Sequence, residues 1–141
     1  MVSEILPALI ALLLAALLGG MLLFSALLAP LVFTQLPAEV AGRFIRAVFP
    51  WYYLWVAGFA ALAAAGLAVD ARGAQAIGLA VAVALSAAWT RWRLMPSINA
   101  LRDRQLAGDA AAGVAFERRH RLSVAINALQ LLAAGWLVAT A

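Results

Sequence analysis

Long stretches of this chain are apolar without interruption, and charged residues break the pattern at only a few places. Charge-free runs lie between Glu4 and Glu39, between Arg46 and Asp70, between Arg72 and Arg91, and after Arg121. Each run is about the 20 residues that a helix needs to cross a hydrocarbon core of roughly 30 Å. The pattern therefore predicts four transmembrane helices, with spans near residues 5–33, 48–69, 74–95 and 120–140.

The connections between these runs also have helical patterns. Pro37 followed by Glu39 is typical of a helix start, so we expect the second helix to begin well before its span and to kink at Pro50. The third helix should continue past Pro96, and Asp109 should cap a fourth helix that runs unbroken into the last span. The predicted fold is an all-α integral membrane protein, an antiparallel four-helix transmembrane bundle whose helices three and four extend into a cytoplasmic hairpin.

Composition supports a membrane protein with one domain, residues 1–141. Of the residues, 67% are hydrophobic and 11% are charged, whereas soluble domains are nearer half apolar and a quarter charged. The first run could also be a signal peptide, but its start lacks basic residues and it is too long for a signal's apolar region, so we interpret it as the first helix.

Charge is distributed unevenly along the chain. All ten basic residues are arginines, and most lie in the 35–47 connection and in the 91–121 stretch. The positive-inside rule then predicts that both connections are cytoplasmic and both termini periplasmic. The arginines suit contact with lipid headgroups, and we expect the bilayer rather than nucleic acid as the partner. An alanine-rich chain with arginine but no lysine is typical of a GC-rich bacterial genome, so we expect the bacterial inner membrane.

A stripe of polar side chains is predicted on the last helix. At about 100° per residue, four polar residues fall within one arc that descends from the cytoplasmic end into the bilayer: His120, Ser123, Asn127 and Gln130. Two interpretations stay open. Such residues either form hydrogen bonds between helices or line a pocket that binds a ligand, ion or proton. We expect His120, Ser123 and Asn127 to face helices one and three.

Other helices carry residues that could complete such a pocket, namely Ser25, Tyr52, Asn99 and Arg102. The aromatic run Trp51-Tyr-Tyr-Leu-Trp55 is interpreted first as an interfacial belt. The alternative is that Tyr52 or Tyr53 turns inward and donates a hydrogen bond to the pocket.

The sequence offers little recognisable chemistry. It has no Cys and no Lys, which excludes thiolate metal sites and Schiff-base catalysis. No catalytic triad, carboxylate pair or nucleotide-binding motif is present, so an enzyme is not favoured. His120 is the candidate metal ligand, and a lone histidine furnishes a metal site poorly.

The order of several short motifs resembles a known family. These are Gly20-Met-Leu-Leu-Phe24, Ala29-Pro-Leu-Val-Phe33 and Val48-Phe-Pro-Trp-Tyr52, then Met95-Pro-Ser-Ile-Asn99 and His120-x-x-Ser-x-x-x-Asn127. The set is similar to the transmembrane-protein-205-like family (domain of unknown function 4149), itself distantly similar to the copper-resistance protein D superfamily. The resemblance implies a small four-span membrane protein with links to metal tolerance, copper or porphyrin. The haem-pathway relatives use a histidine on the first helix and a lysine, which this chain lacks.

Three functions follow from these observations. The first is handling of a metal ion or small solute through a polar pocket near His120, which in so small a protein would need a homo-oligomer. The second is a redox protein that binds haem, porphyrin or quinone, with at most one histidine ligand per protomer. The third is a non-catalytic membrane scaffold or assembly factor that is recognised through its arginine-rich hairpin.

Overall fold

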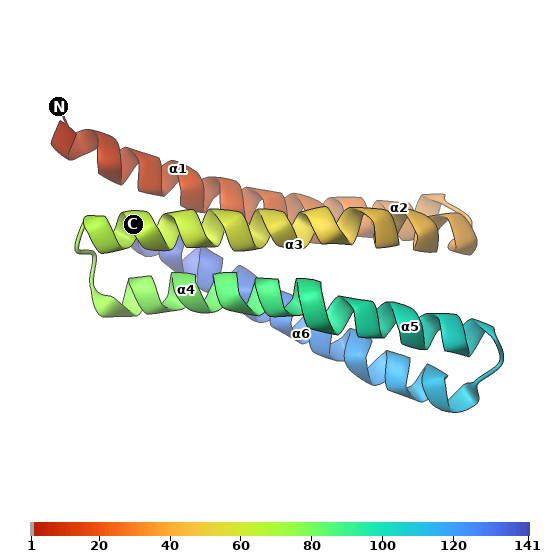
Figure 1. The fold of residues 1–141 in the computed structure, drawn as a ribbon. Coiled ribbons are helices and arrows are strands. Elements are labelled where there is room, and N and C mark those ends of the chain that lie inside the picture. Colours follow the sequence, from red (N-terminus) through yellow and green to blue (C-terminus); the bar gives the residue numbers. More distant parts are fainter. Residues whose placement is uncertain (1) are drawn as a thin grey trace.

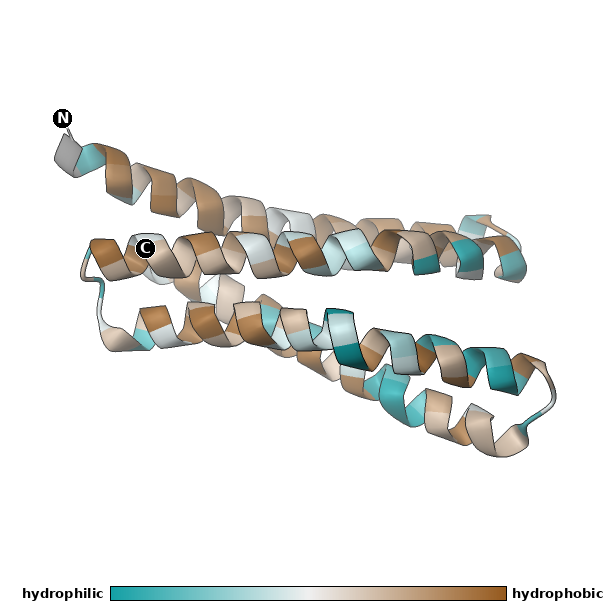
Figure 2. Ribbon diagram, in the orientation of Figure 1, coloured by the Kyte–Doolittle hydropathy of each residue, from teal (hydrophilic) through white to brown (hydrophobic). Residues whose placement is uncertain are grey.

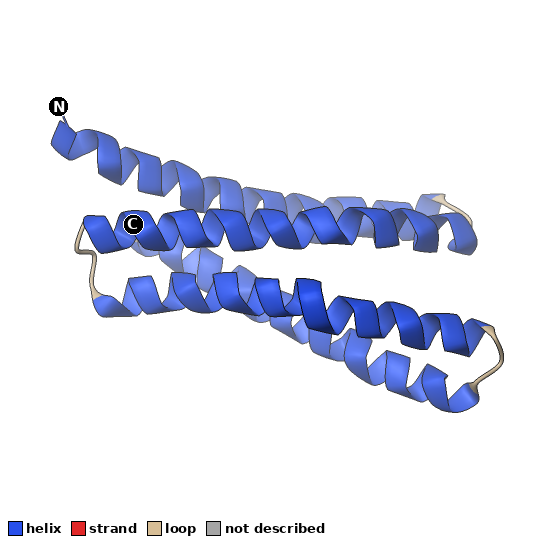
Figure 3. Ribbon diagram, in the orientation of Figure 1, coloured by secondary structure: helices blue, strands red, loops and turns tan. Residues whose placement is uncertain are grey.

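The computed structural model describes residues 2–141, and within them the chain is helical except at short turns (Figure 3). Four continuous helical stretches are long and apolar enough to cross a membrane, at Glu4–Gln35, Ala38–Val69, Ala74–Leu106 and Ala110–Thr140. The prediction of an all-helical protein with four membrane helices is confirmed.

Two of the four stretches are single α-helices and two are interrupted by a π-helical segment. The first stretch comprises α1 (Val2–Leu22), η1 (Leu23–Leu28) and α2 (Ala29–Gln35). The third comprises α4 (Ala74–Trp89), η2 (Thr90–Leu94) and α5 (Met95–Leu106). The second and fourth are α3 (Ala38–Val69) and α6 (Ala110–Thr140).

Each π-helical segment ends two residues before a proline, η1 before Pro30 and η2 before Pro96. The amide of Ala29 donates to the carbonyl of Phe24, and the amide of Met95 donates to that of Thr90, five residues back in both cases. A proline has no amide hydrogen, and its ring crowds the carbonyl four residues earlier, so a wider turn relieves the clash. The two interrupted stretches therefore share a nearby proline, although Pro7 and Pro50 lie inside helices that stay α-helical.

The four stretches form one bundle (Figure 1). The two termini and the α3–α4 turn lie at one end, and the α2–α3 and α5–α6 turns lie at the other, where the two hairpin ends diverge. Hydrophilic residues gather toward this second end, as Figure 2 shows by colour. We call it the polar end.

Small residues allow close packing along α3. Ala60, Ala63, Ala80 and Ala87 are fully buried, in keeping with the small residues that let membrane helices approach one another. At Gly20 a Cβ atom would lie 2.5 Å from Nε1 of Trp55, which itself donates to the carbonyl of Ala16 at 3.3 Å. A larger residue at this position would have to displace the Trp55 side chain from its contact with α1.

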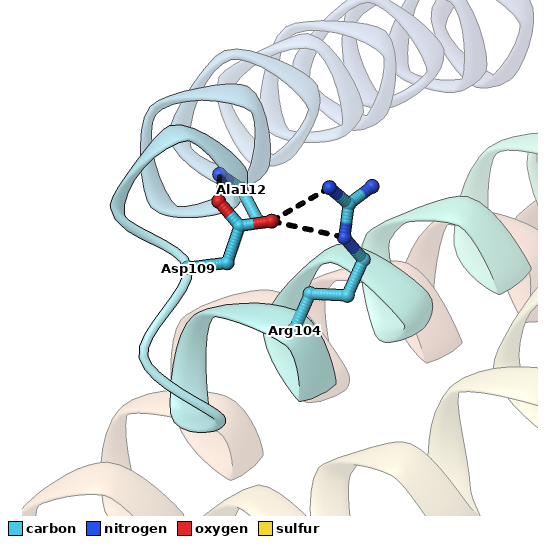
Figure 4. Close-up of polar contacts among 3 residues, drawn as sticks. All are labelled: Arg104, Asp109 and Ala112. Carbon is cyan, nitrogen blue, oxygen red and sulfur yellow. Dashed lines mark hydrogen bonds and ion pairs between the residues drawn. The ribbon is translucent and has the colours of Figure 1, made fainter.

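The α5–α6 turn at the polar end is built as predicted. Gly108 adopts a left-handed φ of 98°, and Asp109 caps α6 by accepting a hydrogen bond from the amide of Ala112 at 3.0 Å. Arg104 donates to the other oxygen of the same carboxylate at 2.6 and 3.1 Å (Figure 4). The Ala112 amide, followed by Arg104, lowers the pKa of Asp109, so the cap stays ionised.

Candidate functional site

Asn127 connects three membrane helices through its side-chain amide. Its Oδ1 accepts a hydrogen bond from the hydroxyl of Tyr52 on α3, and its Nδ2 donates to Oγ of Ser25 on η1 at 3.0 Å. Tyr52 stacks on Phe24, with ring centroids 4.3 Å apart. The polar stripe on α6 therefore meets polar partners contributed by the first and second membrane helices.

Gln130 makes the next polar contact along α6. Its Nε2 donates to Oγ of Ser86 on α4 at 2.9 Å, and the side chain is buried. Its Oε1 is also buried and accepts no hydrogen bond from the described residues. Polar contacts thus tie α6 to all three of the other membrane stretches.

The aromatic run on α3 divides between the two sides of the helix. Trp51 and Trp55 are exposed, as an interfacial belt requires, but Tyr52 and Tyr53 are 6% and 3% exposed. The belt interpretation is therefore wrong for the two tyrosines, which turn inward. The pattern Trp-Tyr-Tyr-Leu-Trp places residues 51 and 55 on one face and residues 52 and 53 on another, because the helix advances by about 100° per residue.

The part of the polar stripe nearest the polar end, His120 and Ser123, is less buried than expected. His120 is exposed, and its ring stacks on Phe116 with centroids 5.8 Å apart. Ser123 donates to the carbonyl of His120 in its own helix at 2.7 Å. Of the three residues expected to face helices one and three, Asn127 reaches helices one and two, while His120 is not buried. The exposed position follows from the divergence of the hairpin ends, which removes the neighbours that would cover it.

A cavity of about 680 Å³ occupies the polar end of the bundle, between the diverging hairpins. All four membrane stretches line it, and its floor includes the Ser25, Tyr52 and Asn127 contact. The predicted residues His120, Ser123, Asn99 and Arg102 also line it. Of the residues predicted to form the pocket, Gln130 alone does not line the cavity. The walls are mainly apolar or aromatic: Phe24, Phe33, Ile45, Phe49, Met95 and Ile98.

The rim of the cavity carries charge. Arg46 on α3 pairs with Asp103 on α5 at 2.7 Å, which joins the two hairpins across the opening. Arg102 and Glu117 also line the cavity, and neither has an oppositely charged group within 4.0 Å among the described residues. The cavity therefore combines a polar floor, apolar walls and a rim with two arginines and one glutamate.

The cavity also reaches the outer surface of the bundle. Phe33 on α2 and Val124 on α6 line it, yet they are 61% and 55% exposed. Both residues are apolar and lie on helices long and apolar enough to span a membrane. A lipophilic molecule in the bilayer would thus have a side entrance to the cavity.

The π-helical segments contribute to the cavity and were not predicted. Phe24 and Ser25 belong to η1, Thr90 belongs to η2, and Met95 follows it directly. Interruptions of this kind are frequent at functional sites, because they redirect side chains and free backbone carbonyls. The prolines at 30 and 96 were the only sequence feature near these segments, and Pro50 inside α3 has no such segment, so a proline alone does not predict one.

The described residues do not gather a metal site. No group of three or more His, Cys, Asp or Glu side chains lies close enough to hold an ion within the part of the chain that was described. Haem also fits poorly, since the single histidine lies at the exposed rim and stacks on Phe116.

Comparison with known proteins identifies one family. No curated protein matches the chain, and no solved structure matches it either. A family model does match residues 12–107, from α1 to the end of α5, which is more than half of the chain. The α6 wall of the cavity, with Asn127 and His120, lies beyond the matched segment. The chain thus belongs to the family described as domain of unknown function (DUF4149).

Proposed function

We propose that this multi-pass membrane protein binds a small lipophilic solute in the cavity at its polar end. The observation that carries the proposal is the cavity itself, because about 680 Å³ lies within the range of small-molecule sites. Its apolar walls and a few converging polar groups are also typical of such sites. Quinones belong to this class of ligand, but we assign no redox reaction.

The proposal includes an orientation. The bundle is antiparallel, and the polar end, with the α5–α6 hairpin, faces the cytoplasm of a bacterial cell whose inner membrane holds the protein. The arginines near that hairpin support this orientation, since basic residues favour the cytoplasmic side. The cavity then opens toward the cytoplasmic leaflet and the cytoplasm.

A pair of glycine substitutions tests the proposal. Gly42 lines the cavity, and a Cβ atom there would meet no atom within 4 Å, so Gly42→Leu should fill part of the cavity without a clash. Gly58 lies on the same helix, also has free space around it and does not line the cavity. Gly58→Leu is therefore a matched control for the change in helix propensity.

The measurement is saturable binding of prodan, a neutral fluorescent naphthalene dye, to the purified protein in detergent. Wild type and Gly58→Leu should bind it alike, and Gly42→Leu should weaken binding by about tenfold, which corresponds to 1.4 kcal/mol. Equal binding by all three proteins, or no saturable binding by wild type, would overturn the proposal.

A further inference from the structure

We infer that the ligand of the cavity is an anionic amphiphile, with an acidic head at Arg102 and an apolar chain between the aromatic walls. This inference rests on the proposed function and adds the chemical class of the ligand. The acidic head is either the carboxylate of a single-chain acid or the phosphate of an anionic phospholipid. Both offer oxygen acceptors that match the planar fork of a guanidinium.

Arg102 has the means to bind such a head. Its side chain is half-buried, it lines the cavity, and no carboxylate lies within 4.0 Å of it among the described residues. One of its five N–H donors bonds to Oε1 of Gln105 at 2.7 Å, and its guanidinium lies 5.3 Å from the centre of the Phe116 ring. These two contacts hold the side chain in place and leave further donors free for a bidentate contact.

The formal charges at the rim sum to zero once Asp103 is included, but the other charged groups offset Arg102 only weakly. Arg46 is largely neutralised by Asp103, at 2.7 Å. Glu117 faces the cavity from α6 but is exposed, so water screens its repulsion of an anion more effectively than it screens the attraction of the half-buried Arg102. A partly buried charge without a partner is costly, and an anion at Arg102 would remove that cost.

The apolar walls and the side entrance of the cavity suit the apolar chain of the proposed ligand. Aromatic and aliphatic side chains line the cavity between its rim and its floor, and the exposed Phe33 and Val124 mark where the cavity meets the bundle surface. The floor groups Asn127, Tyr52 and Ser25 already bond to one another. An apolar chain can therefore approach the floor without leaving these three groups unpaired.

The test compares ligands that differ only in the head. Native mass spectrometry of the protein released from detergent measures binding of oleate against oleyl alcohol, and of phosphatidylglycerol against diacylglycerol. We expect the acid of at least one pair to bind about tenfold more tightly than its neutral counterpart. The pair that shows this preference identifies the source of the head, a single-chain acid or a phospholipid.

Variants assign the preference to one residue. Arg102→Gln should abolish the preference for the acid and keep the binding of the neutral counterpart, and Arg102→Lys should restore part of the preference. Arg118→Gln makes the same charge change on the exposed surface of α6, away from the cavity lining, and should have little effect. Circular dichroism before each titration confirms that the variants are folded.

The possible failures are distinguishable. If acids and neutral counterparts bind equally, or if Arg118→Gln acts as strongly as Arg102→Gln, the anionic class is wrong. The proposed function still stands in that case, provided that Gly42→Leu blocks the neutral ligands. If neither member of either pair binds at a saturable site, both proposals are overturned.

Discussion

Single polar residues in the membrane region decide how the helices are held together. Asn127 makes hydrogen bonds to two other stretches, with Tyr52 on α3 and Ser25 on η1. Ser123 lies one turn earlier on the same helix and bonds only to a carbonyl of that helix. The two residues have similar polarity, but only Asn127 connects helices.

We expect Asn127→Ala to destabilise the protein by about 1–2 kcal/mol, because hydrogen bonds between membrane helices are worth roughly 1 kcal/mol each. Ser123→Ala should be nearly neutral. Thermal unfolding in detergent, followed by circular dichroism, measures both. If the two variants melt alike, Asn127 is not a structural link between the helices.

The sequence predicts which residues of α6 are polar, but it does not reveal their partners. A period of 3.6 residues places Asn127 and Gln130 on one stripe, since periodicity depends only on the helix itself. Which residue of another helix meets that stripe depends on the rotation and tilt of that helix. Tyrosine and tryptophan both suit a membrane interface, so residue type alone gave no indication that Tyr52 turns inward while its neighbour Trp51 stays exposed.

At the scale of the elements, the proline-linked π-helical segments η1 and η2 shape the cavity. The predicted helices and the Asp109 cap depend on run lengths and cap chemistry, which sequence displays directly. The π-helical segments depend on how the surrounding bundle accommodates the backbone next to Pro30 and Pro96, and the sequence alone led us to expect that the third helix continues past Pro96 without a change of turn.

Replacing each proline by alanine restores a backbone N–H and should convert the π-helical turn to a narrower α-helical turn. Pro30→Ala and Pro96→Ala each supply a donor for the carbonyl four residues earlier. Each should stabilise its helix by about 1–3 kcal/mol. Because the wider turn would close, the side chains of η1 or η2 would rotate and prodan affinity should fall.

Pro7→Ala is the control, since Pro7 lies inside α1 and away from both π-helical segments. Thermal melting measures the change in stability, and the prodan titration measures the change in affinity for the cavity. A variant that is more stable and binds the dye as well as wild type would show that the π-helical segments are not needed for the cavity.

The whole molecule has two ends of different character. The end with the termini carries Arg72, whose Nε lies 2.6 Å from Asp70, whereas the polar end carries most of the arginines and the cavity. In a membrane this asymmetry would orient the protein, because basic residues near a span resist translocation. The orientation decides which leaflet would supply the proposed ligand.

Cysteine labelling tests the orientation cleanly, because the chain contains no cysteine of its own. Gln75 and Ala107 are exposed residues beside the α3–α4 and α5–α6 turns. In spheroplasts a membrane-impermeant maleimide should label Gln75→Cys at once and Ala107→Cys only after lysis, since the first position is predicted outside and the second in the cytoplasm. The reverse pattern would place the cavity on the periplasmic side, and an anionic ligand would then have to come from the outer leaflet.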